Sequence, residues 1–397
     1  MTTTVHEPTT TAAAQPTTLL DDYRPATDRL IATPHHTLLG HGTLAELPHD
    51  DTPLATRVRN LLDEARRRTG ERQPLVLGAL PFAPDAPPAL AVPEHVRRAP
   101  ALETDPLIAL PVPITGNAAD WQVREVPAPE AYSAAVAAAV ARMRAGEFDK
   151  VVLARTLELT APHAPDLPAM LRRLARRDPS GYTFAVPTAP GRTLIGASPE
   201  LLVARRGANL TANPLAGSAP RSADLAEDVR RAAALLESPK DLHEHAVVVA
   251  AVREALAPFC RTIDVPERPT LVRTAAMWHL STTVTGELID PDSTTALDLA
   301  CALHPTPAVC GTPTAVARQV IAESEPFDRG AYTGMVGWQN AAGDGEWVVT
   351  IRCAEAEGNT LRLFAGAGVV AASAPEAETA ETGAKFRTFL NAVGAAL

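Results

Sequence analysis

The order in which strand-like and helix-like segments follow one another most constrains how this sequence can fold. Short strand-like runs crowd together over 181–212, helical segments then occupy 222–237 and 240–256, and strand-like runs return at 269–286. Runs of strands thus alternate with runs of helices, without the regular strand–helix alternation of a parallel sheet. The order predicts an α+β fold with large antiparallel β-sheets.

Other segments fit the same class. An amphipathic helix at 54–69 is ended by Gly70, and an alanine-rich helix at 128–147 leads into a strand at 150–159. The proline-rich residues 81–100 predict a surface loop. We further expect strands at 75–82, 107–114, 334–338, 346–354 and 360–366, and helices at 166–177, 293–302, 312–323 and 376–394.

Domain boundaries are not marked in this chain. No internal repeat and no break in composition divides it, so residues 21–397 are expected to form one domain behind a disordered Thr/Pro/Ala-rich tail at residues 1–20. The N-terminal sequence lacks the basic and apolar regions of a secretory signal, and no apolar run approaches the ~20 residues of a membrane span. We therefore expect a cytoplasmic protein.

The net charge and the cysteine spacing restrict which partners and which cysteine chemistry this protein can have. The formal net charge is −10, with arginine and acidic residues interspersed, which argues against a nucleic-acid partner because such proteins usually carry a basic stripe. The four cysteines show no CxxC spacing, so four reduced thiols are expected, neither a disulfide framework nor a zinc site.

Lysine is rare in this chain. The sequence contains only Lys150, Lys240 and Lys385 among 36 basic residues. Arginine cannot readily release its proton near neutral pH, whereas a desolvated lysine can. Lys150, at the head of the predicted strand 150–159, could be a solvated lysine at a strand start or a lysine kept because its amine can release a proton.

Two predicted helices carry paired carboxylates. Asp241 and Glu244 are spaced i, i+3, and Glu378 and Glu381 repeat this spacing near the C-terminus. If the two helices face each other, four carboxylates around a small void would suit a hydrated Mg²⁺; otherwise they are solvated charged faces. The HEH triplet at 243–245 does not suit zinc, because its histidines are two residues apart and not four.

Other candidate residues lie on strands and glycine loops. Ser198 is outside a GxSxG motif, which argues against a hydrolase nucleophile. Glu200 begins an apolar strand, where burial would raise its carboxyl pKa, although an edge-strand glutamate in solvent would fit the same pattern. Arg352 lies among apolar neighbours and would need an anionic partner. The glycine loops at 213–221 and 363–370 could approach an anion or simply form turns.

Ten ordered segments over about residues 130–390 resemble the chorismate-utilising enzymes and, within that family, the isochorismate synthases. They are FDKVVLAR, GASPELLVAR, NPLAGSAPR, SPKDLHEH, WHLSTTVTG, LHPTPAVCGTP, EPFDRGAYTGMVGW, GEWVVTIRCA, LFAGAGVV and ETGAKF. The resemblance implies two large antiparallel sheets packed together with helices outside, forming one chorismate-binding domain. It also implies a reversible Mg²⁺-dependent reaction in which chorismate gains water at carbon 2 and loses its carbon-4 hydroxyl.

The resemblance also implies roles for individual residues. Lys150 would be the general base and Glu200 the general acid, while Mg²⁺ would bind Glu244 and Glu381, with Asp241 and Glu378 supporting it through water. His279 is expected beside the substrate without a proton-transfer role. Substrate contacts are expected from Gly217, His279, Ala308, Arg352, Gly366, Ala367, Gly368 and Lys385.

Alternatives remain open at this stage. A salicylate synthase would form isochorismate and then eliminate pyruvate, and a silent relative would bind chorismate as a partner protein without turnover. Ala308 favours isochorismate as the product, although Val309 and Cys310 depart from the Leu and Ser of close relatives. A monomer is expected, and the downstream product is a siderophore or a quinone.

Overall fold

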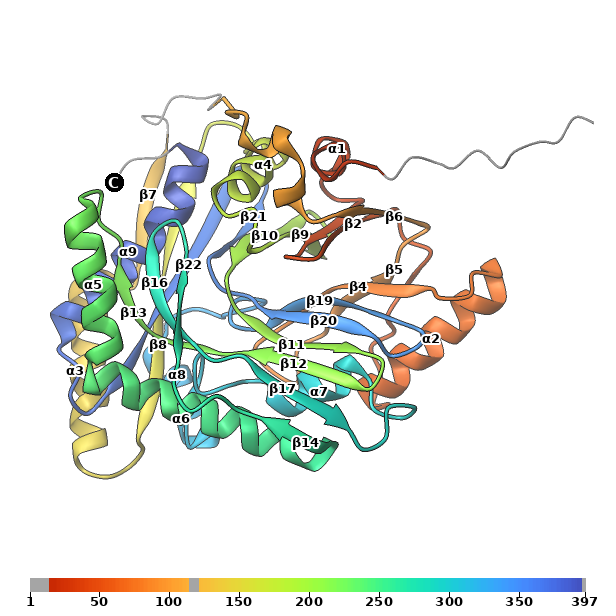
Figure 1. Cartoon of the computed structure of the whole chain (residues 1–397). Helices are drawn as coiled ribbons and strands as arrows, with labels where there is room; N and C mark the ends of the chain where they lie inside the picture. Colours follow the sequence, from red (N-terminus) through yellow and green to blue (C-terminus); the bar gives the residue numbers. More distant parts are fainter. Residues whose placement is uncertain (1–13, 114–120, 395–397) are drawn as a thin grey trace, which may run out of the picture.

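Two large antiparallel sheets packed face to face form the centre of the molecule, as the order of segments predicted (Figure 1). The computed structural model describes residues 14–113 and 121–394. Between the sheets lies an apolar layer that includes Phe184, Val336, Val348 and Phe364. Burial of this layer holds the sheets together, because apolar area removed from water stabilises by about 25 cal/mol per Å².

The first sheet has ten strands. Its order is β18 (Gly311–Thr312), β8 (Lys150–Thr160), β22 (Thr360–Val370), β21 (Cys353–Glu357), β10 (Arg192–Ser198), β9 (Tyr182–Ala189), β1 (Arg29–Ala32), β2 (His36–His41) and β6 (His95–Pro100), with β7 (Gln122–Val126) paired to β8.

The second sheet has nine strands, and a third sheet has three. The second follows the order β14 (Cys260–Asp264), β17 (Val284–Leu288), β12 (Asn209–Asn213), β11 (Leu201–Arg206), β20 (Gly345–Val349), β19 (Met335–Asn340), β4 (Leu75–Leu80), β5 (Ala89–Val92) and β3 (Ala45–Glu46). The third joins β13 (Leu215–Pro220), β16 (Met277–Ser281) and β15 (Thr270–Arg273).

Helices cover the outer faces of both large sheets (Figure 1). The ten-stranded sheet packs against α1 (Pro16–Asp22), α3 (Pro129–Arg144), α4 (Leu167–Arg177), α8 (Thr314–Ser324) and α9 (Pro375–Val393). The nine-stranded sheet packs against α2 (Leu54–Thr69), α6 (Pro239–Leu256) and α7 (Ala296–Leu303), while α5 (Leu225–Glu237) lies on the third sheet.

Local sequence signals explain where several helices begin and end. Gly70 adopts φ +73° after α2, so the helix ends in the left-handed conformation that glycine accepts without a steric penalty. The Ser238 side chain accepts a hydrogen bond from the Asp241 amide, and Pro239 occupies the first position of α6. These caps set the start of α6 and thereby the direction of its acidic side chains.

The N-terminal third departs most from the prediction. Residues 1–13 of the expected tail lie outside the described residues, but Pro16–Asp22 form α1 with Leu19 and Leu20 buried, so the boundary at residue 20 is wrong. The expected loop at 81–100 contains β5 and β6. Both strands complete sheets built from distant segments, which local composition does not reveal.

The strand expected at 107–114 is also wrong. Pro106–Ala109 form a 3₁₀ turn, because the Asp105 side chain accepts a hydrogen bond from the Leu107 amide and Pro106 favours the first turn of a helix. Leu107 and Leu110 are 52% and 59% exposed, so the apolar run is not a buried strand.

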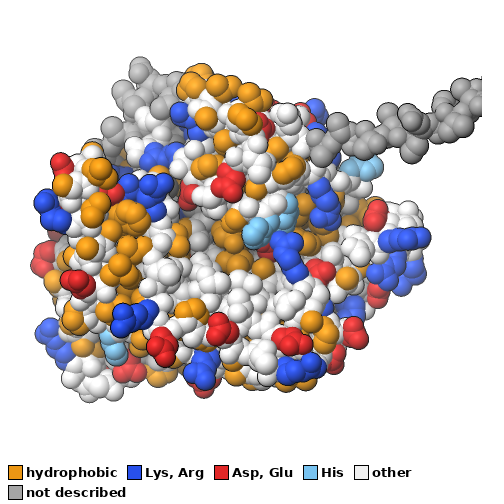
Figure 2. Space-filling view, viewed as in Figure 1, with side chains coloured by type: hydrophobic (Ala, Val, Ile, Leu, Met, Phe, Trp, Pro, Cys, Tyr) orange, Lys and Arg blue, Asp and Glu red, His pale blue; other side chains and the backbone are white. Residues whose placement is uncertain are grey.

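The surface carries one further apolar feature. Leu225, Val229 and Leu236 of α5 are exposed, and Figure 2 shows apolar side chains gathering on the side of the molecule where α5 lies. Within residues 14–113 and 121–394, no helix combines the length and apolar character needed to cross a bilayer.

Candidate active site

The candidate site lies where the chain passes from one large sheet to the other. Between β10 and β11 the chain crosses from the ten-stranded to the nine-stranded sheet, and between β20 and β21 it crosses back. Two backbone hydrogen bonds, each of 3.1 Å, hold the two crossing segments next to each other. The Ala197 amide donates to the Arg352 carbonyl, and the Val349 amide donates to the Glu200 carbonyl. Glu200 and Arg352 are thereby placed together between the sheets.

This placement corrects one expectation about Arg352. Residues 345–354 do not form a continuous strand, because β20 ends at Val349 and β21 begins at Cys353. Arg352 has φ +51°, a left-handed conformation that non-glycine residues rarely adopt and that costs roughly 1–3 kcal/mol. The strain turns the Arg352 side chain out of the sheet and into a cavity.

This cavity is partly enclosed by protein and partly open to solvent. Most of the site residues expected from the sequence line it together. They are Glu200, Gly217, Asp241, Glu244, His279, Ala308, Arg352, Gly366, Gly368, Glu381 and Lys385.

Three expected residues do not line the cavity. Ala367 is fully buried, because side chains alternate along β22 and it points away from the face of Gly366 and Gly368. Glu378 is buried behind the cavity wall and pairs with Lys240 at 3.2 Å. Lys150 lies directly behind Gly368, where it reaches the site through Glu244.

Glu200 is a buried carboxyl in an environment that disfavours its charge. Burial raises the pKa of Glu200 to about 7, although a backbone hydrogen bond from Leu215 and the charges of Lys150 and Arg352 oppose the shift. The sequence pattern predicted this direction, and the alternative of a solvent-exposed edge glutamate is excluded because Glu200 is 3% exposed. A carboxyl with this pKa can hold a proton near neutral pH and donate it.

Lys150 is the first residue of β8 and is 2% exposed. Its Nζ donates a hydrogen bond to Glu244 Oε1 at 2.8 Å. Burial works against ionisation of Glu244, but the Lys150 ammonium outweighs it and holds the pKa of Glu244 below its usual range. Lys150 is desolvated, as expected for a base, but its nearest partner is a carboxylate.

Gly368 makes room for this pair. A Cβ at Gly368 would lie 2.6 Å from Glu244 Oε1 and 3.3 Å from Lys150 Cε. A Cβ at Gly366 would lie 2.8 Å from the Tyr332 hydroxyl. The glycines at 366 and 368 are thus required because side chains from three other segments approach the backbone of β22.

The acidic faces of α6 and α9 lie against each other, since Lys240 of α6 pairs with Glu378 of α9. The sequence had left open whether the two helices face each other or face the solvent. Burial raises the pKa of both Asp241 and Glu378, and the charge of Glu381 raises each further. Each lysine in the chain pairs with one of the four carboxylates: Lys150 with Glu244, Lys240 with Glu378, and Lys385 with Glu381 at 2.6 Å.

These carboxylates do not form a closed metal cage. No three His, Cys, Asp or Glu side chains converge as a metal-ligand group in the part of the chain that the structure describes. Glu244 and Glu381 nevertheless both border the cavity. His243 is exposed and His245 is buried against Thr282, so the two imidazoles diverge as their spacing predicted.

Arg352 lacks a carboxylate partner within the described residues. The polar contact recorded for its guanidinium is with His279 Nε2 at 3.5 Å, and burial lowers the pKa of Arg352. A buried guanidinium without an anion is costly, because its charge has lost water and gained no partner. Arg352 is therefore suited to bind an anionic group that enters the cavity.

His279 is held as a neutral imidazole. Burial first, and the nearby charges of Arg352 and Lys385 second, lower its pKa well below the usual value. A guanidinium can only donate hydrogen bonds, so Nε2 facing Arg352 carries the lone pair. The proton then sits on Nδ1, which lies 2.7 Å from the Ser218 hydroxyl. The expectation that His279 transfers no proton stays a prediction.

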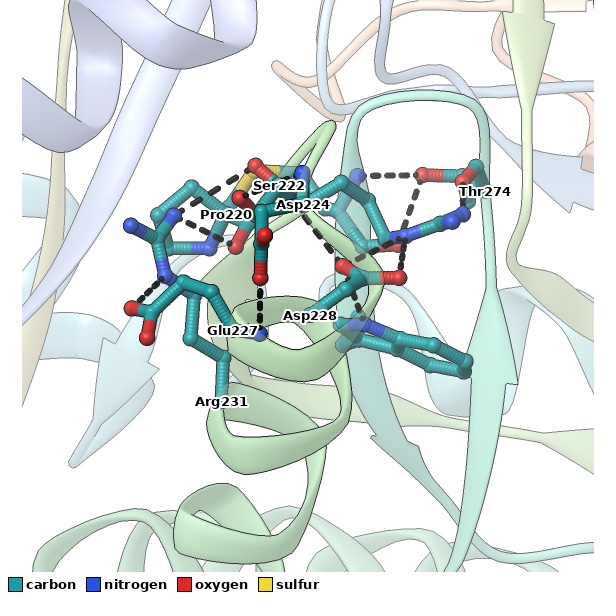
Figure 3. A network of polar contacts seen from close by, with 10 residues as sticks. Pro220, Ser222, Asp224, Glu227, Asp228, Arg231 and Thr274 are labelled. Carbon is teal, nitrogen blue, oxygen red and sulfur yellow. Dashed lines mark hydrogen bonds and ion pairs between the residues drawn. The ribbon is translucent and has the colours of Figure 1, made fainter.

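The buried Asp228 carboxylate links helix α5 to the third sheet through a network of hydrogen bonds (Figure 3). Asp228 of α5 accepts hydrogen bonds from Arg221 Nε at 2.8 Å and from Trp278 Nε1 at 3.1 Å. The hydrogen bond from Arg221 is the largest cause that lowers the pKa of Asp228 to about 2. Since β13 carries Gly217 and Ser218 and β16 carries His279, this network holds the cavity wall at one side.

The prediction missed several residues that line the cavity. They come from segments that the sequence had already singled out, but as apolar or unremarked positions. They are Val152, Leu215, Ser218, Tyr332, Thr333, Ile351 and Phe364. Ser218 could have been suspected because it adjoins Gly217, whereas the apolar residues carry no local signal. Lys240 and Val309, which the sequence analysis had noted without a contact role, also line the cavity.

Comparison with known proteins places these observations in a family. The family model described as chorismate binding enzyme matches residues 110–394. The chain belongs to this family of chorismate-binding enzymes.

Individual relatives are more specific. The isochorismate synthase DhbC of Bacillus subtilis (strain 168) is 52% identical over 387 residues, covering 95% of this chain and 96% of that protein. The vibriobactin-specific isochorismate synthase of Vibrio cholerae is 44% identical over 341 residues, covering 86% and 84%. A crystal structure from Bacillus anthracis, described as a 2,3-dihydroxybenzoate-specific isochorismate synthase, aligns with a TM-score of 0.89 at 48% identity and covers 96% of this chain and all of that one.

Proposed function

We propose that this protein is an isochorismate synthase, an isomerase that converts chorismate to isochorismate. The observation that carries the proposal is a buried carboxyl that lines the cavity, Glu200 with a pKa of about 7, together with the buried amine of Lys150, which reaches the cavity through its partner Glu244. Water added at carbon 2 needs a base, and the hydroxyl that leaves carbon 4 needs an acid. The similarity to isochorismate synthases supports the same conclusion.

In this proposal Lys150 takes a proton from the attacking water and Glu200 gives one to the departing hydroxyl. Lys150 must first leave its ion pair with Glu244, because the pair occupies the Lys150 amine that would contact the attacking water. Glu200 is protonated below about pH 7, so it can start the reaction as an acid. The atoms of water gained and lost balance, and no redox cofactor is needed.

The substrate carries two carboxylates, and the cavity offers cations to hold them. Arg352 would pair with the enolpyruvyl carboxylate, because it is a partly buried guanidinium that lines the cavity and has no carboxylate partner among the described residues. Lys385 donates to the Gly366 carbonyl at 2.9 Å and to Glu381, which places its charge near the ring carboxylate. Such preorganised charges are strong inside a site from which water is excluded.

Mg²⁺ fits the donor set of Glu244 and Glu381. Magnesium prefers oxygen ligands and commonly uses one or two protein carboxylates with waters and substrate oxygens, so a closed cage is not required. Both carboxylates border the cavity and each is paired only with a lysine, whose charge a cation could replace. When bound, Mg²⁺ would supply positive charge for the ring carboxylate, and Asp241 and Glu378 would support it through water.

We further propose that the isochorismate serves 2,3-dihydroxybenzoate siderophore synthesis. The Bacillus anthracis structure that is described with this specificity covers 96% of this chain. Salicylate synthase remains the competing activity, and Ala308 at the cavity is the residue that favours isochorismate as the final product.

One assay tests the proposal. The purified chain is incubated with chorismate and Mg²⁺, and products are separated by chromatography and identified by mass. Isochorismate without pyruvate is the expected result. Salicylate with equimolar pyruvate would assign the competing lyase activity, and chorismate binding without turnover would assign a silent binding protein.

A further inference from the structure

A buried ion pair outside the cavity contacts several segments of its wall. Arg329 and Glu325 are both buried, and Arg329 donates to Glu325 from Nε at 2.8 Å and from NH2 at 2.5 Å. Neither residue lines the cavity, and the mechanism proposed above uses neither. A buried pair of this kind is a weak source of stability, because desolvation offsets much of its attraction.

The remaining donors of Arg329 all reach residues of the cavity wall. NH1 donates to the Val309 carbonyl at 2.9 Å and to the Thr333 hydroxyl at 3.1 Å, and NH2 donates to the Val152 carbonyl at 2.8 Å. Together with the two bonds to Glu325, these contacts use all five N–H groups of the guanidinium. Val152, Val309 and Thr333 each line the cavity.

Arg329 also contacts the aromatic ring of Tyr332, another residue that lines the cavity. The Arg329 guanidinium lies 5.7 Å from the Tyr332 ring centroid, and that ring stacks on Phe364 at 4.8 Å. Glu325 completes the arrangement by accepting a hydrogen bond from the Ala154 amide of β8 at 2.8 Å. Thr333 has φ +56°, so its backbone needs support to stay in this conformation.

We propose that Arg329 is a positioning residue for the reaction, which fixes the mutual arrangement of the base-bearing strand β8, the 305–310 segment and the Tyr332–Thr333 turn around bound chorismate. These three segments lie apart in the sequence, and the Arg329 guanidinium donates a hydrogen bond to each of them. Lysine cannot replace it, because an ammonium has three donors and no planar fork. The inference rests on the proposed function for its substrate.

The test compares Arg329→Lys with Arg205→Lys. Arg205 is a matched control: it is equally buried and binds the Ala342 carbonyl and Asp344, but it lies on β11 away from the cavity lining. Thermal unfolding of each variant is followed by circular dichroism. Steady-state kinetics give KM, and kcat is calculated from the concentration of folded protein. The Kd for chorismate is measured by calorimetry in a Lys150→Ala background, where substrate binds without turnover.

We expect Arg329→Lys to raise KM and Kd by about tenfold or more, since a wall misplaced by a fraction of an ångström loses substrate contacts. Arg205→Lys should lower the melting temperature and leave KM and Kd unchanged. Glu325→Gln provides a second variant if Arg329→Lys does not fold, and its KM and Kd should shift in the same direction.

Unchanged KM and Kd in a folded Arg329→Lys or Glu325→Gln variant would overturn the proposal, and so would equal shifts in Arg205→Lys. The Kd measurement requires only that chorismate binds, and it does not depend on turnover. If the wild type binds chorismate without making isochorismate, the proposed function fails while the positioning role is still decided.

Discussion

Lys150 Nζ lies 2.8 Å from Glu244 Oε1, so the candidate base on β8 is tied to a candidate metal ligand on α6. Both side chains are mostly removed from water, and Gly368 leaves the space in which they meet. Base and carboxylate therefore form one unit, and changes to any of the three residues should disturb the other two.

Removal of the Lys150 amine should abolish turnover without abolishing binding. We expect Lys150→Ala to lower kcat by about 10²–10⁴, the usual contribution of a general base. Lys150→Arg is the matched control for charge, because arginine keeps the cation beside Glu244 but cannot release its proton. It should be as inactive as Lys150→Ala, while calorimetry still detects chorismate binding. Near-normal kcat in Lys150→Arg would refute the base assignment.

The pKa of Glu200 predicts how activity depends on pH. Because burial raises this pKa to about 7, kcat/KM should fall as pH rises through 7 and the acid loses its proton. Glu200→Gln cannot donate a proton and should lose activity at every pH. A wild-type profile that stays flat from pH 6 to 9 would contradict the acid role.

The same shift predicts a stability effect. The folded pKa lies above the ordinary value of 4.5, so the unfolded chain ionises first and stability falls as pH rises from 4.5 to about 7. The loss amounts to about 3 kcal/mol at 1.36 kcal/mol per pKa unit. Glu200→Gln should lack this loss, so its free energy of unfolding relative to wild type should improve between pH 4.5 and 7. Denaturant titrations at both pH values measure it, and parallel behaviour of the two proteins would argue against the shift.

The activity should depend on Mg²⁺ bound by the two cavity carboxylates, Glu244 and Glu381. Removal of divalent ions by EDTA should stop turnover, and Mg²⁺ should restore it. We expect Glu244→Gln and Glu381→Gln to raise the Mg²⁺ concentration for half-maximal activity at least tenfold. Glu376→Gln is the control, because Glu376 is an exposed residue in the first turn of the same helix as Glu381. An equal change in all three variants would point to net charge and not to ligation.

The close approach at Gly368 gives a steric prediction. Gly368→Ala would place a Cβ 2.6 Å from Glu244 Oε1, so the Lys150–Glu244 pair must move and activity should fall by at least tenfold. Gly383→Ala in α9 is the control, since its Cβ meets nothing closer than 3.8 Å. There the substitution should stabilise the helix by about 0.5–1 kcal/mol and leave activity intact. Normal kinetics in Gly368→Ala would show that the pair tolerates displacement.

Much of the fold was accessible from the sequence because helices and strands leave local periodic signals. The helix at 54–69 and the strand at 150–159 were predicted nearly to their observed ends. The strands β5 and β6 were missed because their proline-rich sequence is typical of a loop, although β5 pairs with the preceding strand β4 and β6 pairs with β2. The third sheet was not anticipated, since short strands do not reveal which sheet they join.

The site was predicted through the family resemblance and through residue chemistry, and its members do meet, except that Ala367, Glu378 and Lys150 lie outside the cavity lining. The roles of Lys150 and Glu200 as base and acid stay predictions. Arg329 carried no signal of its own, because a buried guanidinium is recognisable only by the carbonyls that surround it.

The sequence by itself determined most of the helices and the longer strands, and it supplied an amine, a carboxyl at the start of an apolar strand and two acidic helix faces. The tertiary structure alone decided that Glu200, Glu244 and Glu381 line one cavity and that the Lys150 amine contacts it through Glu244. Two strand crossings between the sheets bring Glu200 and Arg352 together, and the strain at Arg352 turns its side chain inward. Local patterns encode backbone conformation, whereas the meeting of distant segments depends on how two sheets bury their common apolar face.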